Sequence, residues 1–360
     1  MPRVINRRGG RVIPGPGRGG FRGGLIGGRG GFGVPLVPVV NDGNVEYVTE
    51  ESSSSPSRPA EGGSDGEFEP DLEDVFLVKD LLKRAGDLPD EIALMILDSA
   101  EYWACSSTTV EYDNLQRGSL HIRGTTGENK FLVRSEPLGM SLWSPDDQEA
   151  WHSQARPQEI REVVSREKLH EYVDKRIDAA LESPCRKIVF KITSHDQGWG
   201  GNIADKGTFK GSWTWFDAGI DRFTSEPESL NGKAPSEGSG DVSVSSLRPV
   251  WPPIKEADDG STVYDHGVHA AQDHKIQGNK TATRETQHHT VEWNYADDIN
   301  PELSEADKLE DIGRGRATGN GEFVRNLKLG DMVTVWGRAR FGGWENVVKK
   351  VELKIYWKAA

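Results

Sequence analysis

The chain of 360 residues carries a formal net charge of −13 and contains 42 Gly, 11 Trp and only 2 Cys. No apolar run approaches the length of a membrane span, and the two distant cysteines form neither a disulfide framework nor a metal-ligand spacing. We therefore expect a protein without a membrane segment in a reducing compartment, the cytoplasm or the nucleus.

The first 33 residues form a basic, glycine-rich head with seven Arg and no acidic residue, whereas residues 41–80 contain twelve Asp or Glu. Such a sequence buries too little apolar area to offset chain entropy, so we expect residues 1–70 to be disordered, with 34–70 as a Ser-rich, acidic linker. Arginines with interleaved phenylalanines can contact phosphates and stack on bases, which makes the head a candidate RNA-binding segment. Its candidate residues are Arg8, Arg18, Arg22, Arg29, Phe21 and Phe32. A basic tail that only aids solubility is the alternative.

Residues 71–105 predict a short helical segment. Apolar residues recur at helical spacing over 75–82 and again over 92–97. Pro89 is acceptable in the first turn of the second helix. Two short helices should therefore precede the next part of the chain.

Residues 106–360 predict a β-sandwich domain. Strand-like runs occupy 108–132, 187–193, 212–216, 281–293, 323–327, 332–340 and 347–357. In the last run, apolar residues alternate with Glu352 and Lys354, so one face should be buried and the other wet. A helical insertion is expected near 158–181, and long loops at 224–246, 256–278 and 297–312. The predicted fold class is mainly β with a small α part, an antiparallel sandwich or jelly roll preceded by short helices and a disordered N-terminus.

Three stretches in the last half of the chain resemble a family of uncharacterised fungal proteins. They read CRKIVFKITSHDQGWGG, GSWTWFDAGI and GEFVRNLKLGDMVTVWGRARFGGWENVVKKVELKIYW. A Leu-Gly-Asp turn leads into a late core strand, and this layout resembles galactose-binding-like jelly rolls. The resemblance implies a fold and does not by itself imply a ligand.

The segment LPDEIALMILDSAEYW, residues 88–103, resembles the first helix of an F-box, whose pattern is Leu-Pro-x-Glu-Ile. This resemblance implies docking to a ubiquitin-ligase scaffold. An F-box continues through further helices, whereas the Ser-Ser-Thr-Thr-Val run at 106–110 is a poor helix former. A plain helix start is the alternative.

A glycine-shaped loop follows the strand run at 187–193 and supplies the first candidate ligand-binding group. Its members are His195, Asp196, Gln197 and Trp199. In one interpretation the polar side chains bind a polar ligand while Trp199 stacks on its apolar face. In the other, Asp196 and Gln197 close the loop backbone and Trp199 plugs the end of the sandwich.

The second candidate group comprises Trp336, Arg338, Arg340 and Trp344. Period-two geometry places Trp336, Arg338 and Arg340 on one face of a strand. An Arg beside a Trp suits an acidic or planar partner, and it equally suits structural stacking. If the loops after the two strands meet at one end of the sandwich, Trp199 and Trp344 should line one cleft.

Patterns for other chemistry are incomplete. Five histidines, all within residues 266–289, lack the matching Cys or carboxylate pair that a zinc site requires. They are His266, His269, His274, His288 and His289. The acidic run at 297–307 lacks the alternation of a calcium loop, and the Gly-rich run at 313–321 lacks the Gly-Lys-Ser/Thr ending of a phosphate loop. We therefore expect no catalytic residue, no metal and no cofactor.

The expected function is that of a non-catalytic intracellular binding or adaptor protein whose sandwich recognises a protein or a polar ligand, with carbohydrate as one polar candidate. There are two alternatives. One is RNA association through the basic, glycine-rich head, in which the triplet Arg-Gly-Gly recurs. The other is an F-box-like adaptor role.

Overall fold

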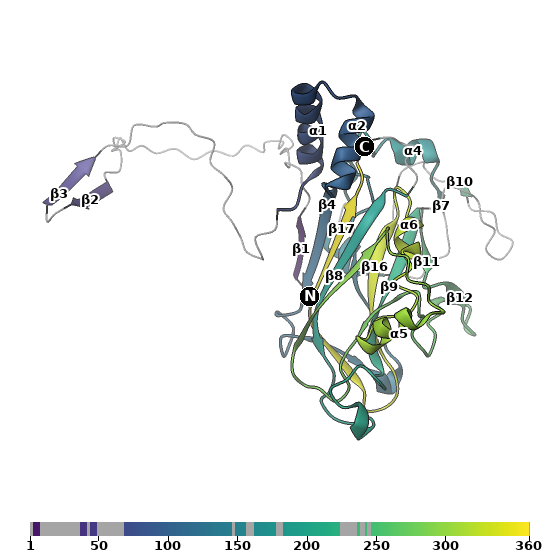
Figure 1. Ribbon diagram of the computed structural model, residues 1–360. Coiled ribbons are helices and arrows are strands. Elements are labelled where there is room, and N and C mark those ends of the chain that lie inside the picture. Colours follow the sequence, from purple (N-terminus) through teal and green to yellow (C-terminus); the bar gives the residue numbers. More distant parts are fainter. Residues whose placement is uncertain are drawn as a thin grey trace, which may run out of the picture. The chain divides into compact units, whose positions relative to one another are not determined.

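The computed structural model describes most of the chain from Phe68 onwards and three short segments before it (Figure 1). The described residues are 3–7, 37–41, 44–48, 68–145, 148–155, 162–177, 183–223, 236–237, 242 and 246–359. One compact unit comprises Met1–Gly10 and Glu69–Ala360, and a second comprises Arg11–Phe68. In the second unit, strands β2 (Val37–Asn41) and β3 (Asn44–Val48) form an antiparallel hairpin.

The larger unit contains two antiparallel sheets. The six-stranded sheet has the order β1-β4-β17-β8-β15, with β5 also paired to β17. Its strands are β1 (Arg3–Arg7), β4 (Ala104–Glu111), β5 (Leu120–Arg123), β8 (Cys185–His195), β15 (Gln287–Asn294) and β17 (Glu345–Trp357). The five-stranded sheet has the order β11-β9-β16-β6, with β14 also paired to β9. Its strands are β6 (Asn129–Arg134), β9 (Thr214–Phe223), β11 (Leu247–Trp251), β14 (Lys275–Gly278) and β16 (Met332–Ala339). The predicted mainly-β, antiparallel fold class is confirmed.

Alternating apolar residues of both sheets build one hydrophobic core, as in a sandwich. Phe190 and Ile192 from β8 belong to the same cluster as Phe216 and Ala218 from β9. The face of β17 that carries Glu352 and Lys354 was predicted to be exposed to solvent, but both side chains are buried. These two side chains form an ion pair of 3.1 Å, and Lys354 also pairs with Glu69.

Two helices precede the sandwich, as the sequence predicts. Helix α1 (Leu72–Gly86) begins with a capping box between Asp71 and Asp74, and its chain reverses at Asp87, whose φ of 48° is left-handed. Helix α2 (Asp90–Ser99) leads after a short turn into β4. Both helices add apolar residues to the sandwich core, namely Leu72, Val75, Phe76 and Leu97.

The smaller elements complete the architecture. Strand β7 (Glu162–Val163) pairs in parallel with β10 (Ser236–Glu237), and β12 (Ile254–Glu256) pairs with β13 (Thr262–Tyr264). The remaining helical elements are η1 (Gly124–Thr126), α3 (Gln148–Ser153), α4 (Arg166–His170), η2 (Ile203–Asp205), α5 (Ser304–Asp311) and α6 (Glu322–Arg325).

Several segments differ from the sequence-based expectations. The range 297–312 holds helix α5, because Ala306 and Leu309 lie three residues apart and are both buried. The run at 323–327 begins as helix α6 and not as a strand, since the chain turns at Gly321 with a φ of 70° and buries Val324. The range 256–278 includes strands β13 and β14.

The expected helical insertion and the expected loop at 224–246 also differ in detail from the structure. The described part of 158–181 contains only β7 and the short helix α4, while Val173 and Ile177 reach the core from turns. The expected loop at 224–246 contains β10, and most of the rest of it lies outside the described residues. Within residues 1–70, the structure describes strands β1, β2 and β3, of which β1 pairs with β4.

Four connections meet at one end of the sandwich, opposite the end that carries α1 and α2 (Figure 1). Strand pairing requires this, because His195 lies beside Val347, and Ala339 lies beside Thr214. The connections are residues 196–213, 340–344, 279–286 and 124–128. We call this region the loop end.

Candidate functional site

The loop after β8 is held by a buried carboxylate. Asp196 is completely buried, and its two oxygens accept hydrogen bonds from the backbone N–H groups of Gly198 (2.7 Å), Ala282 (2.6 Å) and Thr283 (2.8 Å). Burial raises the pKa of Asp196, and the three N–H donors oppose that rise. The carboxylate therefore joins two of the connections at the loop end.

Gln197 and His195 also bind backbone. Gln197 donates from Nε2 to the carbonyl of Trp199 (2.6 Å) and accepts at Oε1 from the N–H of Glu345 (3.0 Å). Nδ1 of His195 lies 2.6 Å from the carbonyl oxygen of Asp196. The polar side chains of the first candidate group are thus engaged with the loops themselves, as the second sequence interpretation describes.

Trp199 does not plug the sandwich, because it is 59% exposed. Its ring lies over Gly343, where an added Cβ would come within 3.2 Å of the ring. The ring of Trp344 lies over Gly201 in the same manner, since a Cβ there would come within 3.5 Å of it. The structure thus brings Trp199 and Trp344 together. Each ring lies on a glycine of the loop that carries the other ring.

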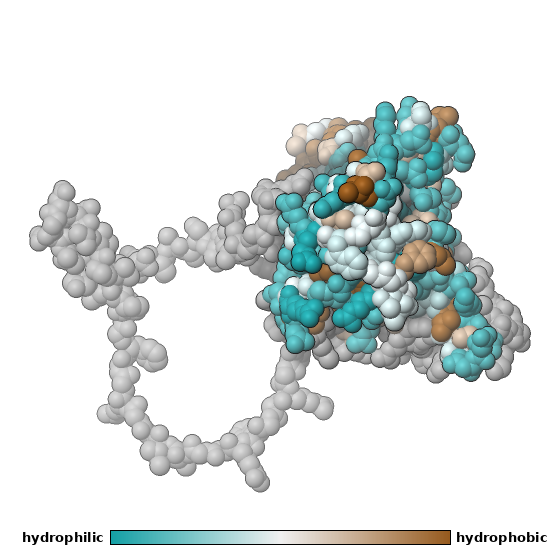
Figure 2. All heavy atoms as spheres, turned by 90° about the horizontal axis from the view of Figure 1, so that it is seen from below, coloured by the Kyte–Doolittle hydropathy of each residue, from teal (hydrophilic) through white to brown (hydrophobic). Residues whose placement is uncertain are grey.

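Two further exposed apolar side chains lie on the same two connections. Ile203 is 90% exposed and Phe341 is 50% exposed. The ring of Phe341 packs edge-on against Trp213, with centroids 4.5 Å apart, and its backbone φ of 65° is unusual for a residue other than glycine. Figure 2 looks onto this end, where pale and brown atoms gather near the middle with teal, hydrophilic atoms on both sides. The loop end is therefore an aromatic surface on a hydrogen-bonded backbone.

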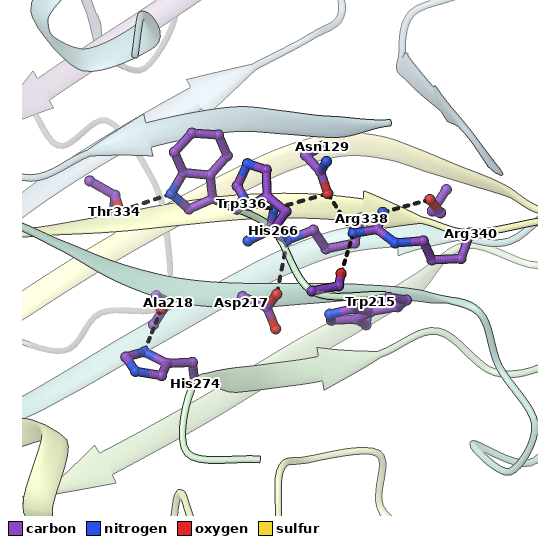
Figure 3. Close-up of polar contacts among 12 residues, drawn as sticks. Asn129, Trp215, Asp217, Ala218, His266, His274, Thr334, Trp336, Arg338 and Arg340 are labelled. Carbon is purple, nitrogen blue, oxygen red and sulfur yellow. Dashed lines mark hydrogen bonds and ion pairs between the residues drawn. The ribbon is translucent and has the colours of Figure 1, made fainter. Parts of the chain in front are cut away.

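Trp336 and Arg338 lie on strand β16 of the five-stranded sheet, and Arg340 is the first residue of the connection that follows this strand (Figure 3). All three are buried, with Trp336 only 4% exposed. The Arg338 guanidinium lies 5.4 Å from the ring centre of Trp336, and that of Arg340 lies 5.3 Å from the ring centre of Trp215. These arginines stack inside the protein and are not presented at its surface.

Arg338 has three polar partners. Its Nε donates to Asp217 Oδ2 (2.9 Å), and its Nη1 donates to Asn129 Oδ1 (3.0 Å) and to His266 Nδ1. Burial, together with Arg338 and Arg340, lowers the pKa of His266 to about 3, so the imidazole is neutral and accepts the hydrogen bond.

The guanidinium of Arg340 is held mainly by neutral oxygens. Nη2 donates to Asn129 Oδ1 (2.7 Å) and to the carbonyl of Gly267 (2.8 Å), and Nη1 donates to the carbonyls of Ala339 (2.9 Å) and Gly127 (3.2 Å). The arginines therefore tie the sheet to the segment around His266, which covers it.

Two polar atoms in this cluster are buried without a hydrogen-bond partner among the described residues, Trp215 Nε1 and Asp217 Oδ1. Both residues project from the same side of β9, and Figure 3 shows them next to one another. One is a donor and the other an acceptor.

The remaining histidines and both cysteines occupy separate positions. His274 stacks on Trp251 with ring centres 4.1 Å apart, and His288 bonds to Thr193. Burial raises the pKa of both thiols, Cys105 and Cys185, to about 12. Among the residues that the structure describes, no group of three or more His, Cys, Asp or Glu is arranged to hold a metal ion.

The candidate RNA-binding residues of the head lie outside the described part of the chain. The F-box-like segment forms α2, and β4 begins only five residues after that helix ends at Ser99, so no further helix follows it directly. Within the described residues, no helix has the length and apolarity to cross a membrane.

Searches against protein-family models, curated proteins and solved structures find no match to this chain. The resemblances to a fungal family, to galactose-binding-like jelly rolls and to an F-box therefore stay predictions.

Sequence reasoning missed three partners in the buried cluster, Asn129, Asp217 and His266. The only available signal was that Asp217 follows Trp215 at strand spacing, which places both on one face. The contacts of Arg338 with His266 and Asn129 span 72 and 209 residues, and no local pattern marks such pairs.

Proposed function

We propose that this protein is a non-catalytic binding or adaptor protein whose loop end recognises a protein or a polar ligand, including carbohydrate. The observation that carries the proposal is the exposure of Trp199 on a loop whose backbone is fixed by buried Asp196. An exposed aromatic side chain on a fixed backbone loses little conformational freedom on binding, which favours affinity.

The neighbouring side chains support this interpretation. Exposed aromatic rings stack on the apolar faces of sugars and fill pockets of protein partners, and Trp and Tyr are enriched where proteins bind. Phe341 adds a second exposed ring, held edge-on by Trp213. The polar side chains His195, Asp196 and Gln197 act in this proposal by positioning the rings and not by contacting the ligand.

A glycan array with the full chain tests the carbohydrate arm, and quantitative affinity capture from a cell lysate tests the protein arm. Both use wild type, Trp199→Ala and Trp344→Ala, with Leu142→Ala as a control because Leu142 is exposed elsewhere. We expect at least one ligand whose binding falls about tenfold or more in both Trp variants and is unchanged in the control. Binding that is indifferent to both Trp substitutions would refute the proposal.

A further inference from the structure

Helices α1 and α2 carry a second exposed apolar surface, at the other end of the sandwich from the loop end. Five large apolar side chains there are between 40% and 64% exposed. They are Leu77 and Leu81 on α1, and Ile92, Met95 and Ile96 on α2. We call these five residues the hairpin stripe.

The stripe is not the face that attaches the helices to the sandwich. That attachment uses a different set of buried residues, Leu72, Val75, Phe76, Ala93 and Leu97. A surface helix needs one apolar face towards its own core. Each helix of this hairpin also exposes large apolar side chains away from that face, and exposed apolar surface of this kind commonly marks an interaction site.

Charge indicates the kind of partner. Residues 72–99 contain seven acidic and three basic residues, a net charge of −4. Arg176 and Arg186 from elsewhere in the chain pair with two of these acids, Glu73 and Asp98. Asp90 uses both Lys79 and Lys83 as ion-pair partners. The carboxylates of Asp80, Asp87 and Glu91 are exposed and form no ion pair among the described residues, which leaves the surroundings of the stripe acidic.

We infer that the hairpin stripe docks an amphipathic helix of another protein, apolar on one face and basic on its flanks. The spacing of Ile92, Met95 and Ile96 (i, i+3, i+4) is the pattern that packs against a helix. Basic flanking residues would complement the three free carboxylates. A second copy of this hairpin and an anionic lipid surface both carry the wrong charge for it.

This inference is independent of the loop end, because no residue is shared between the two surfaces. The exposed position of the stripe also makes it testable without disturbing the fold. Gln has nearly the same helix propensity as Leu and Met, so Leu81→Gln and Met95→Gln remove apolar surface and keep both helices.

The experiment measures fluorescence anisotropy of two labelled peptides of about 18 residues, or five helical turns, against the full chain. Both peptides have the same leucine stripe, and their polar positions are all Lys in one and all Glu in the other. We expect the Lys peptide to bind at least about tenfold more tightly than the Glu peptide, and the Leu81→Gln/Met95→Gln double variant to lose at least about tenfold in affinity. The Leu142→Gln control should bind as wild type does.

Equal binding of the two peptides, or equal losses in the double variant and the control, would overturn the inference. Two further measurements examine other occupants. Self-association of the full chain that disappears in the double variant would identify a second copy as the partner. A labelled peptide of residues 8–33 that requires Leu81 and Met95 and binds more tightly than the Lys peptide would identify the chain's own head instead.

Discussion

Two regions of this protein have similar proportions of aromatic and polar residues, but one is exposed to solvent and the other is buried. In the loop after β8, Trp199 is 59% exposed, whereas Trp336 on β16 is 4% exposed. The difference arises from distant parts of the chain, because the segment carrying His266 covers β16 and nothing among the described residues covers Trp199 in this way. Residue type alone therefore does not separate a binding surface from a packed interior.

The polar side chains of the two regions also differ in what they bind. Asp196 accepts from backbone N–H groups and so fixes the shape of two loops. Arg338 binds the side chains of Asp217, Asn129 and His266 and so joins a sheet to its cover. Substitutions in the buried region should therefore affect stability, and those at the loop end should affect mainly the local geometry.

The largest effect is expected from Arg338→Met, which leaves Asp217 as a buried carboxylate without its cation. Loss of one partner of a buried ion pair typically costs about 3–5 kcal/mol in the free energy of unfolding. Urea denaturation measures this change, with Arg123→Met as the control. The Arg123 side chain is 65% exposed, so the control should change stability by less than about 0.5 kcal/mol. Equal effects of the two substitutions would show that Arg338 is not buried as described.

An intermediate effect is expected from Asp196→Asn, which keeps the shape of the side chain and places an NH₂ group against backbone donors. Leaving a buried donor unsatisfied costs about 1–3 kcal/mol, and the loop should loosen. Hydrogen exchange at the amides of Gly198, Ala282 and Thr283 reports the loosening directly. The exposed Asp258→Asn control should leave these exchange rates unchanged. Unchanged rates in Asp196→Asn itself would show that Asp196 does not hold these three amides.

The effect that is smallest near neutral pH, and that grows on acidification, is the pH dependence contributed by His266, whose folded pKa is lowered to about 3. The unfolded chain takes up a proton near the ordinary His pKa of about 6.5, so stability falls as the pH drops from there towards about 3. His266→Asn retains an acceptor for Arg338 without titrating in this range, and should make the fall shallower. His289, with a pKa lowered to about 4, supplies part of the remaining slope.

Thermal unfolding at several pH values measures this dependence. The exposed His170→Asn variant is the control and should follow the wild-type curve. An His266→Asn curve parallel to that of the wild type would mean that folding does not lower the pKa of His266.

The sequence predicted the parts of the fold that local periodicity determines. Alternation identified β8, β16 and much of β17, and the helical spacing of apolar residues identified α1 and α2. Helix α5 was missed because its sequence, SEADKLED, is highly charged and only Ala306 and Leu309 face inwards. The strand expected at 323–327 failed because a short apolar run does not distinguish a helix from a strand.

The candidate site was predictable in its residues and not in its arrangement. The sequence offered two roles for Asp196, ligand binding or loop closure, and could not choose between them. The choice depends on the N–H groups of Ala282 and Thr283, which lie 86 and 87 residues away. The proximity of Trp199 to Trp344 required the pairing of β8 with β17, which sets both loops at one end.

Strand β17 has a mechanical consequence. Its 13 residues run from Glu345, next to Trp344 at the loop end, to Trp357, which pairs with Ala104 just beyond α2. It is hydrogen-bonded to β8 on one side and to β4 and β5 on the other. A pull between the two ends of the sandwich would act along this strand, so its cross-strand bonds would share the load in shear and not open one after another. A protein bound by partners at both ends would therefore resist tension best along the axis of β17.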